Sequence, residues 1–442
     1  MEVENPTWYR SRGYVHFDRP ISVDHAVKIV TNPIKVARRA FFPFLHFELV
    51  TYRVKWNKES KKLVKNPKSR SVSYASHIDS HIYSYYSSLL SIAYENALRA
   101  RGLTENVLAF RKLNESNIGF AKMAFESIRR RGECTAIGLD IEGFFDNLDH
   151  KILKSSWRSV LGVTNLPADH YAIFKSITSY AKVNRDAIYK EFGISKNNPR
   201  TQPIEICSGI EFRQKVRTLI ERNNKGFGIP QGSPISATLS NLYLIEFDEL
   251  MKNFVDSIGG DYFRYCDDIL LITSTRHQDA ALRFAERMIK ESKLRIQQKK
   301  TEKREFKFQN HKDRGKVLRS TKPLQYLGFL FDGEQVFLRS ASLARFSDRL
   351  RRGAKLAIAT MNKRNRHRKT LGLDVRPLFR KKLRERYTHF GRRNFLTYGY
   401  KAADLLESRA IRKQLKPLYK KFRRRTGQQK RLPTNTSIDN QI

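Results

Sequence analysis

Two adjacent aspartates set in apolar sequence constrain this chain more than any other feature. Residues 261–273, DYFRYCDDILLIT, place Asp267 and Asp268 between apolar and aromatic residues on both sides. This pattern predicts a β-hairpin with the acidic pair at or near its turn. An exposed acidic turn would account for the pair alone. The apolar flanks instead indicate a mostly buried hairpin, in which an unpaired carboxylate is costly unless it has a partner or a purpose.

A second apolar run ends in a carboxylate in the same way. Residues 136–139 lead into Asp140, and Phe144 and Phe145 follow. If this strand lies beside the hairpin, Asp140 and Asp267 converge, and the three carboxylates can hold two Mg²⁺ ions, which prefer hard oxygen ligands. Two such ions about 3.5–4 Å apart stabilise the attacking and leaving oxygens of a phosphoryl transfer. A single strand-end Asp is more often a cap or a surface residue, so the prediction depends on both sites.

The charge of the chain indicates the partner. Its 442 residues include 86 Lys and Arg against 43 Asp and Glu, a net charge of +43, while 40% hydrophobic residues exclude wholesale disorder. Nucleic acid is the first partner to expect. There is no apolar run of 18 residues, no signal-peptide core and no CxxC pair among three cysteines. These features argue against a membrane, a zinc site or a disulfide framework, and favour a reducing cytoplasm.

The basic excess is concentrated in the last quarter of the chain. Residues 339–442 carry a net charge of +25. Apolar residues at spacings of three and four from Leu343 to Met361 predict a helix that packs on a core and presents cations to a phosphate backbone. A solvated face would mix charges of both signs. The candidate nucleic-acid-binding residues are Arg351, Arg352, Lys355, Lys363 and Arg364. From Gln428 we expect a frayed tail.

Strands and helices alternate through the rest of the chain, which favours an α+β or α/β architecture. Strands are predicted within 134–141, 261–273 and 324–332, and helices within 118–130 and 279–292. The segment 228–234, GIPQGSP, is a Gly/Pro loop that leads into a helix, a weak signal alone because such turns are common. Residues 151–222 are interpreted as an inserted helical segment.

The order of these motifs resembles that of reverse transcriptases. Asp140 with Phe145, the PQGSP loop and YCDD correspond to motifs A, B and C of that family. Residues 294–301 resemble motif D, residues 325–329 resemble the primer grip of group II intron-type enzymes, and residues 68–72 resemble the fingers strand. The resemblance covers roughly residues 60–335.

The resemblance implies a role for each matching residue. Asp140 and Asp267 would bind two Mg²⁺ ions, with the Ile141 carbonyl as an extra ligand and Asp268 as a less direct one. Phe145 would exclude a ribose 2′-hydroxyl and so select dNTPs. The remaining implied roles are nucleotide pocket for Gln231, triphosphate neutralisation for Lys68 and Arg70, pyrophosphate contact for Lys300, and primer grip for Tyr326, Leu327 and Gly328.

The resemblance also implies the fold, an α+β right-hand polymerase. Residues 1–130 would form the N-terminal region and fingers, and residues 131–335 a palm built on a small antiparallel sheet. Residues 336–442 would form a basic helical thumb and tail. The long segment between motifs A and B and the sequence RYCDDIL are most similar to bacterial class-two defence-associated reverse transcriptases. That class implies a structured non-coding RNA copied into cDNA in anti-phage defence in the bacterial cytoplasm.

Other functions remain open at this point. A degenerate palm that only binds RNA would not need intact Asp140, Asp267 and Asp268. An RNA-directed RNA polymerase would favour a small residue at 145, where this chain has Phe. A group II intron-like maturase acting as an RNA chaperone would require an intron in the encoding locus, and a template-independent polymerase is a further alternative.

Overall fold

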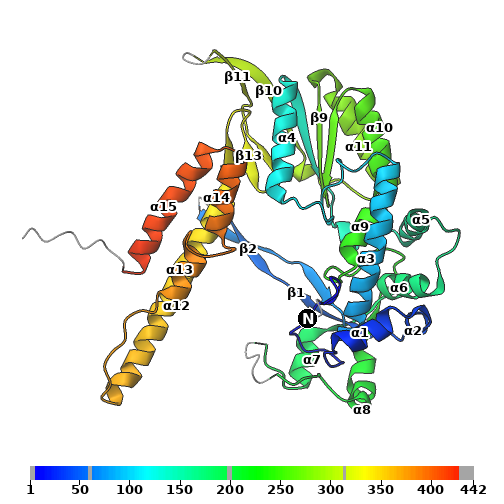
Figure 1. Ribbon diagram of the computed structural model, residues 1–442, viewed down its shortest axis with the longest axis vertical. Helices are drawn as coiled ribbons and strands as arrows, with labels where there is room; N and C mark the ends of the chain where they lie inside the picture. The colour runs from blue at the N-terminus through cyan, green and yellow to red at the C-terminus, as the bar shows by residue number, and fades with distance from the viewer. Residues whose placement is uncertain (1–4, 58–61, 197–201, 312–314, 428–442) are drawn as a thin grey trace, which may run out of the picture. The chain divides into compact units, whose positions relative to one another are not determined.

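The computed structural model describes residues 5–57, 62–196, 202–311 and 315–427 as a mixture of helices and strands (Figure 1). The chain forms two compact units, each assembled from three separate stretches of sequence. Unit 1 comprises residues 1–111, 139–271 and 277–301, and unit 2 comprises residues 112–138, 272–276 and 302–442. The mixed architecture agrees with the predicted α+β class, whereas the predicted domain limits stay a prediction. None of the helices in these described ranges has the length and hydropathy needed to span a membrane.

Unit 1 contains a four-stranded sheet, a two-stranded hairpin and most of the helices. The sheet has the strand order β4-β1-β6-β7, in which β1 pairs antiparallel with β4 and parallel with β6. Its strands and those of the hairpin are β1 (Phe44–Glu48), β2 (Thr51–Asn57), β3 (Lys62–Lys68), β4 (Ser71–Tyr74), β6 (Ala181–Asn184) and β7 (Glu221–Arg222). Its helices are α1 (Val23–Val30), α2 (Pro33–Ala37), α3 (His77–Ala100), α5 (His150–Leu161), α6 (Ala168–Thr178), α7 (Arg185–Glu191), α8 (Gly209–Glu211), α9 (Ser236–Tyr243), α10 (Ile245–Ser257) and α11 (Gln278–Glu291).

Residues 151–222 differ from the expected helical insertion. They contain α5 to α8, but also strands β6 and β7, which extend the sheet that β4 and β1 begin. The strands are four and two residues long. Such short runs show too few alternations to stand out from helical sequence, so periodicity alone does not reveal them.

The N-terminus of α3 is capped from two directions. Ser76 accepts a hydrogen bond from the backbone N–H of Asp79, and Asp18 accepts from the N–H groups of His77 and Ile78 at 2.8 and 2.9 Å. Both contacts satisfy N–H groups that a helix leaves unpaired in its first turn. The Asp18 contacts tie the N-terminal segment to α3 across about 60 residues of sequence.

Two buried histidines accompany this N-terminal segment. The Nδ1 atom of His16 accepts the N–H of Phe17 at 2.8 Å, and burial lowers the pKa of His16 to about 3. The ring of His81 stacks on Tyr9 with centroids 4.7 Å apart, and burial, with the Arg12 charge, lowers the pKa of His81 to about 4. Both imidazoles are therefore neutral near pH 7.

A five-stranded sheet has the order β11-β10-β5-β9-β8. The division between the units falls within β5 and β9, so each strand contributes residues to both. Strand β10 pairs antiparallel with β5 and with β11. The strands are β5 (Cys134–Asp140), β8 (Asp261–Tyr265), β9 (Asp268–Thr273), β10 (Glu302–His311) and β11 (Gly315–Arg319), which agree with the predicted strands in 134–141 and 261–273.

The described residues of unit 2 add a small antiparallel sheet and five helices. The sheet has the order β12-β13-β14, and its strands are β12 (Leu324–Tyr326), β13 (Phe329–Phe331) and β14 (Val336–Leu338). The helices are α4 (Asn117–Arg131), α12 (Ser340–Thr370), α13 (Lys381–Tyr387), α14 (Phe395–Leu405) and α15 (Arg409–Arg425). The tail expected from Gln428 lies outside the described residues.

Candidate active site

The acidic pair lies at a tight hairpin turn, as its flanking sequence predicts. Strand β8 ends at Tyr265 and β9 begins at Asp268, so Cys266 and Asp267 form the turn. Cys266 has a φ of +60°, a left-handed conformation that few side chains adopt without strain. Burial, together with the neighbouring Asp267 charge, raises the pKa of the Cys266 thiol. The thiol therefore stays protonated. Asp267 and Asp268 are both partly exposed.

The end of strand β5 meets this turn. The backbone N–H of Ile141 donates to the carbonyl of Asp267 at 3.1 Å. This contact joins the residue after Asp140 to the first aspartate of the turn, and so places the two carboxylate-bearing segments side by side within unit 1. The three aspartates that the sequence singles out thus come from adjoining strand ends.

The segment that resembles motif D lies against the same strand end. The N–H of Glu142 donates to the Arg295 carbonyl at 2.8 Å, and the N–H of Gln297 donates to the Asp140 carbonyl at 2.8 Å. At the end of this segment, the Lys300 ammonium forms an ion pair with the Asp140 carboxylate. The sequence suggested a pyrophosphate contact for Lys300, and the structure places its ammonium on a candidate metal ligand.

The Gly/Pro loop packs against two other segments of unit 1. The N–H of Ile229 donates to the Phe145 carbonyl at 2.9 Å, and the Gln231 carbonyl accepts from the N–H of Ser73 at 2.8 Å. Glycine is required at 232, where φ is +114° and a Cβ atom would lie 2.6 Å from the Ser73 carbonyl. The loop therefore fixes Gln231 against β4 and bonds to the backbone of Phe145.

The two phenylalanines after Asp140 have different environments. Phe144 is buried, whereas Phe145 is partly exposed, and their ring centroids are 5.7 Å apart. Phe144 therefore serves packing, and Phe145 remains available to contact a nucleotide. The next residue, Asp146, has its pKa raised by burial and by the Glu48 charge.

Lys68 and Arg70 lie at the end of the β2–β3 hairpin and on the way to β4. Lys68 is the last residue of β3, paired with Thr51. The Arg70 backbone exchanges two hydrogen bonds with Leu49, at 2.8 and 3.1 Å, and its side chain is exposed. A contact of these cations with a triphosphate stays a prediction.

A buried ion pair beneath the acidic turn was not foreseen from the sequence. Arg264 and Asp248 are both fully buried and form a two-pronged pair, with N–O distances of 2.6 Å. Although burial disfavours its charged form, the Asp248 carboxylate raises the pKa of Arg264 above its ordinary value. Arg264 also donates to the Cys266 carbonyl at 3.1 Å, and so holds the turn that carries Asp267. The sequence did contain one indication of this pair, because Arg264 is a charged residue within an otherwise apolar strand.

The residues that resemble a primer grip lie in unit 2. Tyr326 ends β12, and Leu327 and Gly328 form the turn to β13 with φ values of +45° and +94°. The Asn117 side chain donates to the Leu327 carbonyl at 3.0 Å and fixes this turn to the start of α4. Their contact with a primer stays a prediction.

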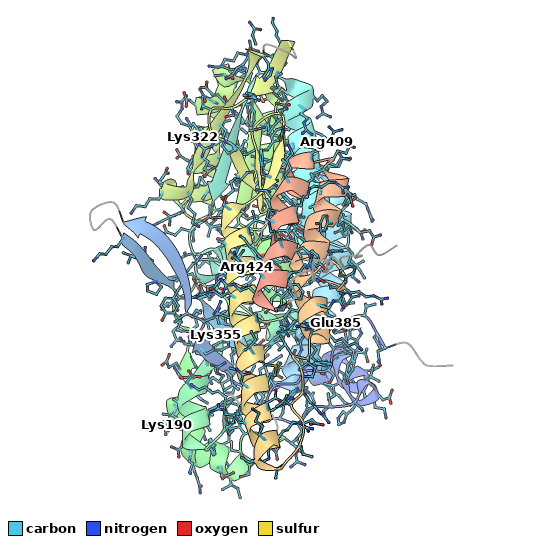
Figure 2. The ribbon with its side chains drawn as sticks, turned by 90° about the vertical axis from the view of Figure 1, so that its left-hand side faces the viewer. Lys190, Lys322, Lys355, Glu385, Arg409 and Arg424 are labelled. Carbon is cyan, nitrogen blue, oxygen red and sulfur yellow. The ribbon has the colours of Figure 1, made fainter. Side chains whose placement is uncertain are left out.

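The candidate nucleic-acid-binding cations lie on α12. Figure 2 labels Lys355 on this helix, with Glu385 on α13 and Arg424 on α15. Arg351 and Arg352 both pair with Asp348, at 2.6 and 2.8 Å. All five predicted cations of this helix are exposed: Arg351, Arg352, Lys355, Lys363 and Arg364.

The donor chemistry of the site suits a hard divalent cation. Asp140, Asp267 and Asp268 supply carboxylate oxygens from adjoining backbone segments, which are the ligands that Mg²⁺ prefers. Within the described residues, no three His, Cys, Asp or Glu side chains are gathered closely enough to hold a metal ion. The Lys300 ammonium balances Asp140 instead. The fit to Mg²⁺ is therefore one of ligand type and backbone placement.

Carboxylates on adjoining strand ends are ligands suited to the metal ions of a phosphoryl transfer. The comparison with protein families agrees: the model for "Reverse transcriptase (RNA-dependent DNA polymerase)" matches residues 93–331, more than half of the chain. The chain belongs to the reverse transcriptase family and carries an RNA-dependent DNA polymerase domain. No curated protein matches it.

Telomerases are among the similar solved structures. Apo telomerase from Candida tropicalis is 9% identical, with 93% of this chain and 60% of that chain covered and a TM-score of 0.44. A form truncated from the C-terminal domain is 10% identical, with 72% and 61% covered and a TM-score of 0.40. Telomerase from Candida albicans, in complex with a fragment of telomeric RNA, is 10% identical, with 92% and 66% covered and a TM-score of 0.38. The chain spans 60–66% of the length of these structures.

Proposed function

We propose that this protein is an RNA-directed DNA polymerase whose reaction centre is formed by Asp140, Asp267 and Asp268. The observation that carries the proposal is the backbone hydrogen bond from Ile141 to Asp267, which joins the two chain segments that bear Asp140 and Asp267. Membership of the reverse transcriptase family supports it. In this proposal residues 1–130, 131–335 and 336–442 act as fingers, palm and thumb.

The reaction is the extension of a primer by one deoxynucleotide. The oxygen of the primer 3′-hydroxyl forms a bond to the α-phosphorus of a dNTP, the bond from that phosphorus to the bridging oxygen breaks, and pyrophosphate leaves. The hydroxyl proton passes to solvent. Two Mg²⁺ ions held by Asp140 and Asp267, with Asp268 and the Ile141 carbonyl nearby, would neutralise the charge that develops on the phosphate oxygens.

Other residues of the site position the nucleotide in this proposal. Phe145 lies under the sugar and excludes a 2′-hydroxyl, while Gln231 lines the pocket. Lys68 and Arg70 neutralise the triphosphate. Lys300, which pairs with Asp140, would contact the leaving pyrophosphate. In unit 2, the turn formed by Tyr326, Leu327 and Gly328 grips the primer.

The template in this proposal is a structured non-coding RNA, copied into cDNA in anti-phage defence in the bacterial cytoplasm. The net charge of +43 and the exposed cations of α12 support an RNA partner. The long segment between motifs A and B and the sequence RYCDDIL, which resemble those of the class-two defence-associated enzymes, support the proposed lineage. Sequencing of the nucleic acid that copurifies from the native locus tests it: one abundant short RNA with complementary DNA is expected. Heterogeneous cellular RNA without cDNA would contradict it.

Replacement of the acidic pair tests the polymerase itself. Asp267→Ala with Asp268→Ala should lower primer extension on an RNA template at least about 1,000-fold, because metal binding contributes several kcal/mol to the transition state. RNA affinity should stay within about twofold, since it comes from basic side chains. The matched control is Asp24→Ala with Asp256→Ala, which removes two exposed carboxylates of α1 and α10. Near wild-type extension by the first variant would sink the proposal.

A further inference from the structure

The outer half of helix α12 exposes apolar side chains. The buried residues of this 31-residue helix are Phe346, Leu350 and Ala354, all in its first half. From 355 to 370 each residue is exposed or only partly buried. Leu356 is 69% exposed. An apolar helix face that lies open beside cationic side chains is suited to being covered by another molecule.

A return segment completes a groove on this face. After α12 ends, residues 371–380 run back beside it. The Asn365 side chain donates to the Arg376 carbonyl at 2.8 Å and accepts the Arg376 N–H at 2.9 Å. Arg368 donates to the Asp374 carbonyl at 2.6 Å. These contacts fix the segment and present Phe379, which is 66% exposed.

The groove between α12, this segment and α13 has a volume of about 920 Å³ and lies entirely within unit 2. Its apolar lining includes Leu356, Met361, Leu378 and Phe379. Its cationic lining consists of Arg364, Arg368, Arg376, Arg380, Lys382 and Arg386. None of the described residues that line it is acidic. A lining that combines apolar side chains with several cations and no carboxylate suits an occupant that has both flat or apolar surfaces and negative charge.

We propose that this groove, here called the α12 groove, binds unpaired bases of an RNA loop or bulge, with its arginines on the flanking phosphates. The inference rests on the proposed function, in which a structured RNA is the template. An A-form duplex presents phosphates and 2′-hydroxyls and keeps its bases stacked inside, so it cannot fill an apolar groove. Unpaired bases splay onto aromatic, apolar and guanidinium surfaces, which Phe379, Leu356 and the arginines supply.

Charge complementarity favours RNA over an acidic protein helix. A phosphate backbone places a negative charge at every nucleotide and can meet six cations around one groove. An amphipathic helix lays its apolar face in a groove and keeps its carboxylates on the flanks, so it meets fewer of them. The concentration of basic residues in this part of the sequence points the same way.

The test compares RNAs that differ only in pairing. We would measure, by fluorescence anisotropy on the full chain, affinity for a hairpin with an eight-nucleotide unpaired loop and for a blunt duplex of equal phosphate number. Leu356→Ala with Phe379→Ala should weaken binding of the hairpin about tenfold or more and binding of the duplex less than twofold, because base stacking contributes only to the first. A 4-thiouridine in the loop should crosslink within residues 356–387.

The matched control is Ile34→Ala with Leu250→Ala, which removes two exposed apolar side chains of unit 1. This variant should bind both RNAs like the wild type. Since Leu356 and Phe379 are mostly exposed, their replacement should leave the melting temperature unchanged, which circular dichroism would check. Extension of a preformed primer–template, measured in parallel, separates this proposal from the proposed function. A wild-type chain that binds the loop but extends no primer would contradict only the latter.

Two results would overturn the groove proposal. The first is an equal reduction of hairpin and duplex affinity, or no reduction of either, in the double variant. The second concerns a synthetic acidic amphipathic peptide of 16 residues, compared with a scrambled peptide of the same composition. A protein helix would be the occupant under the following result. The wild type binds the amphipathic peptide but not the scrambled one, and the double variant loses this peptide binding but keeps its affinity for the hairpin.

Discussion

Two regions of the molecule differ in how their charged side chains are placed. They are the strand ends that carry the aspartates, and the outer half of α12. Beneath the acidic turn, Arg264 and Asp248 are fully buried and satisfied by one another. Along α12, Lys355, Lys363 and Arg364 stand in solvent with little apolar burial behind them. The first region is held in place by the protein's own contacts, as a reaction that needs exact atomic placement requires. The second is left incomplete, as a surface that a polyanion covers can be.

The largest expected effect is the difference in unfolding free energy between the loss of a buried ion pair and the loss of an exposed one. Asp248→Ala leaves the Arg264 guanidinium buried without its partner and should lower the free energy of unfolding by about 3–5 kcal/mol. Asp404→Ala removes the partner of Arg412 in a pair that is more than half exposed, and should change it by at most about 1 kcal/mol. Urea denaturation followed by circular dichroism measures both.

A double replacement sharpens this result. Asp248→Leu with Arg264→Met removes both charges and should recover most of the stability, since an apolar pair of similar volume replaces a buried ion pair at little cost. Primer extension by this double variant should nevertheless be slower than that of the wild type, because residue 264 no longer donates a hydrogen bond to the Cys266 carbonyl. Equal destabilisation by Asp248→Ala and Asp404→Ala would erase the contrast between the two regions.

Acid should act on the buried part of unit 1 first. His16 and His81 have pKa values lowered to about 3 and about 4 by burial, against an ordinary value of 6.5. Between pH 6.5 and pH 4 these two histidines therefore bind more protons in the unfolded chain than in the folded one. The free energy of unfolding is highest above pH 6.5 and falls as the pH drops towards 4. The slope is about 1.4 kcal/mol per pH unit for each histidine, or up to about 4 kcal/mol between pH 6.5 and pH 5.

His81→Phe provides the control for this pH dependence. A phenyl ring can keep the stacking on Tyr9 but cannot take up a proton. The variant should lose about 1.4 kcal/mol per pH unit from the wild-type slope of unfolding free energy against pH in this range, measured by urea denaturation at several pH values. An unchanged slope would assign the acid sensitivity to other groups.

Nucleotide selection should depend on Phe145 and not on its neighbour. Phe145→Ala should lower the discrimination of dNTP against the ribonucleotide about 10- to 100-fold, since contacts with one small group contribute about 1–3 kcal/mol. Phe144→Leu, at the buried position, should affect stability more than selection. Ratios of kcat/KM for the two nucleotides measure this, and an unchanged ratio in Phe145→Ala would demote that residue to packing.

The smallest effects are expected along α12. Replacement of Lys355, Lys363 and Arg364 by Gln should reduce the slope of log RNA affinity against log salt by about 0.7–0.9 for each phosphate that is no longer neutralised. Arg351→Gln with Arg352→Gln should reduce it less, because both side chains already pair with Asp348. Titrations from 50 to 300 mM salt compare the two sets, and a larger change in the second would mean that Asp348 does not compete with RNA.

The sequence predicted best where a motif coincides with a local element. The hairpin of 261–273 and the helices within 118–130 and 279–292 follow from periodicity, because these elements depend on residues close in sequence. The family followed from the order of Asp140, the PQGSP loop and Asp267. The short strands β6 and β7 were not seen, since β6 exists through pairing with β1, over 130 residues away, and β7 through pairing with β6.

The partners of individual side chains were also beyond prediction. Lys300 and Asp140 are 160 residues apart, and the sequence around either residue does not indicate that the other is its partner. Arg264 was visible as a charge within an apolar strand, but its partner on α10 was not. The α12 groove depends on a return segment whose position is set by Asn365, a residue without a motif.

Two positions of the Gly/Pro loop accept no residue other than glycine without a shift of the neighbouring backbone. A side chain at 232 would collide with the Ser73 carbonyl, and one at 228 would lie 2.8 Å from the Asp146 carbonyl. The two glycines thus touch different segments, one on β4 and one beside the candidate nucleotide pocket. If both glycines were replaced, the segments that carry Ser73 and Asp146 would both have to move, which no single further substitution can achieve. In a saturation mutagenesis experiment, these two positions should form a narrow minimum of mutational tolerance, flanked by more permissive sites.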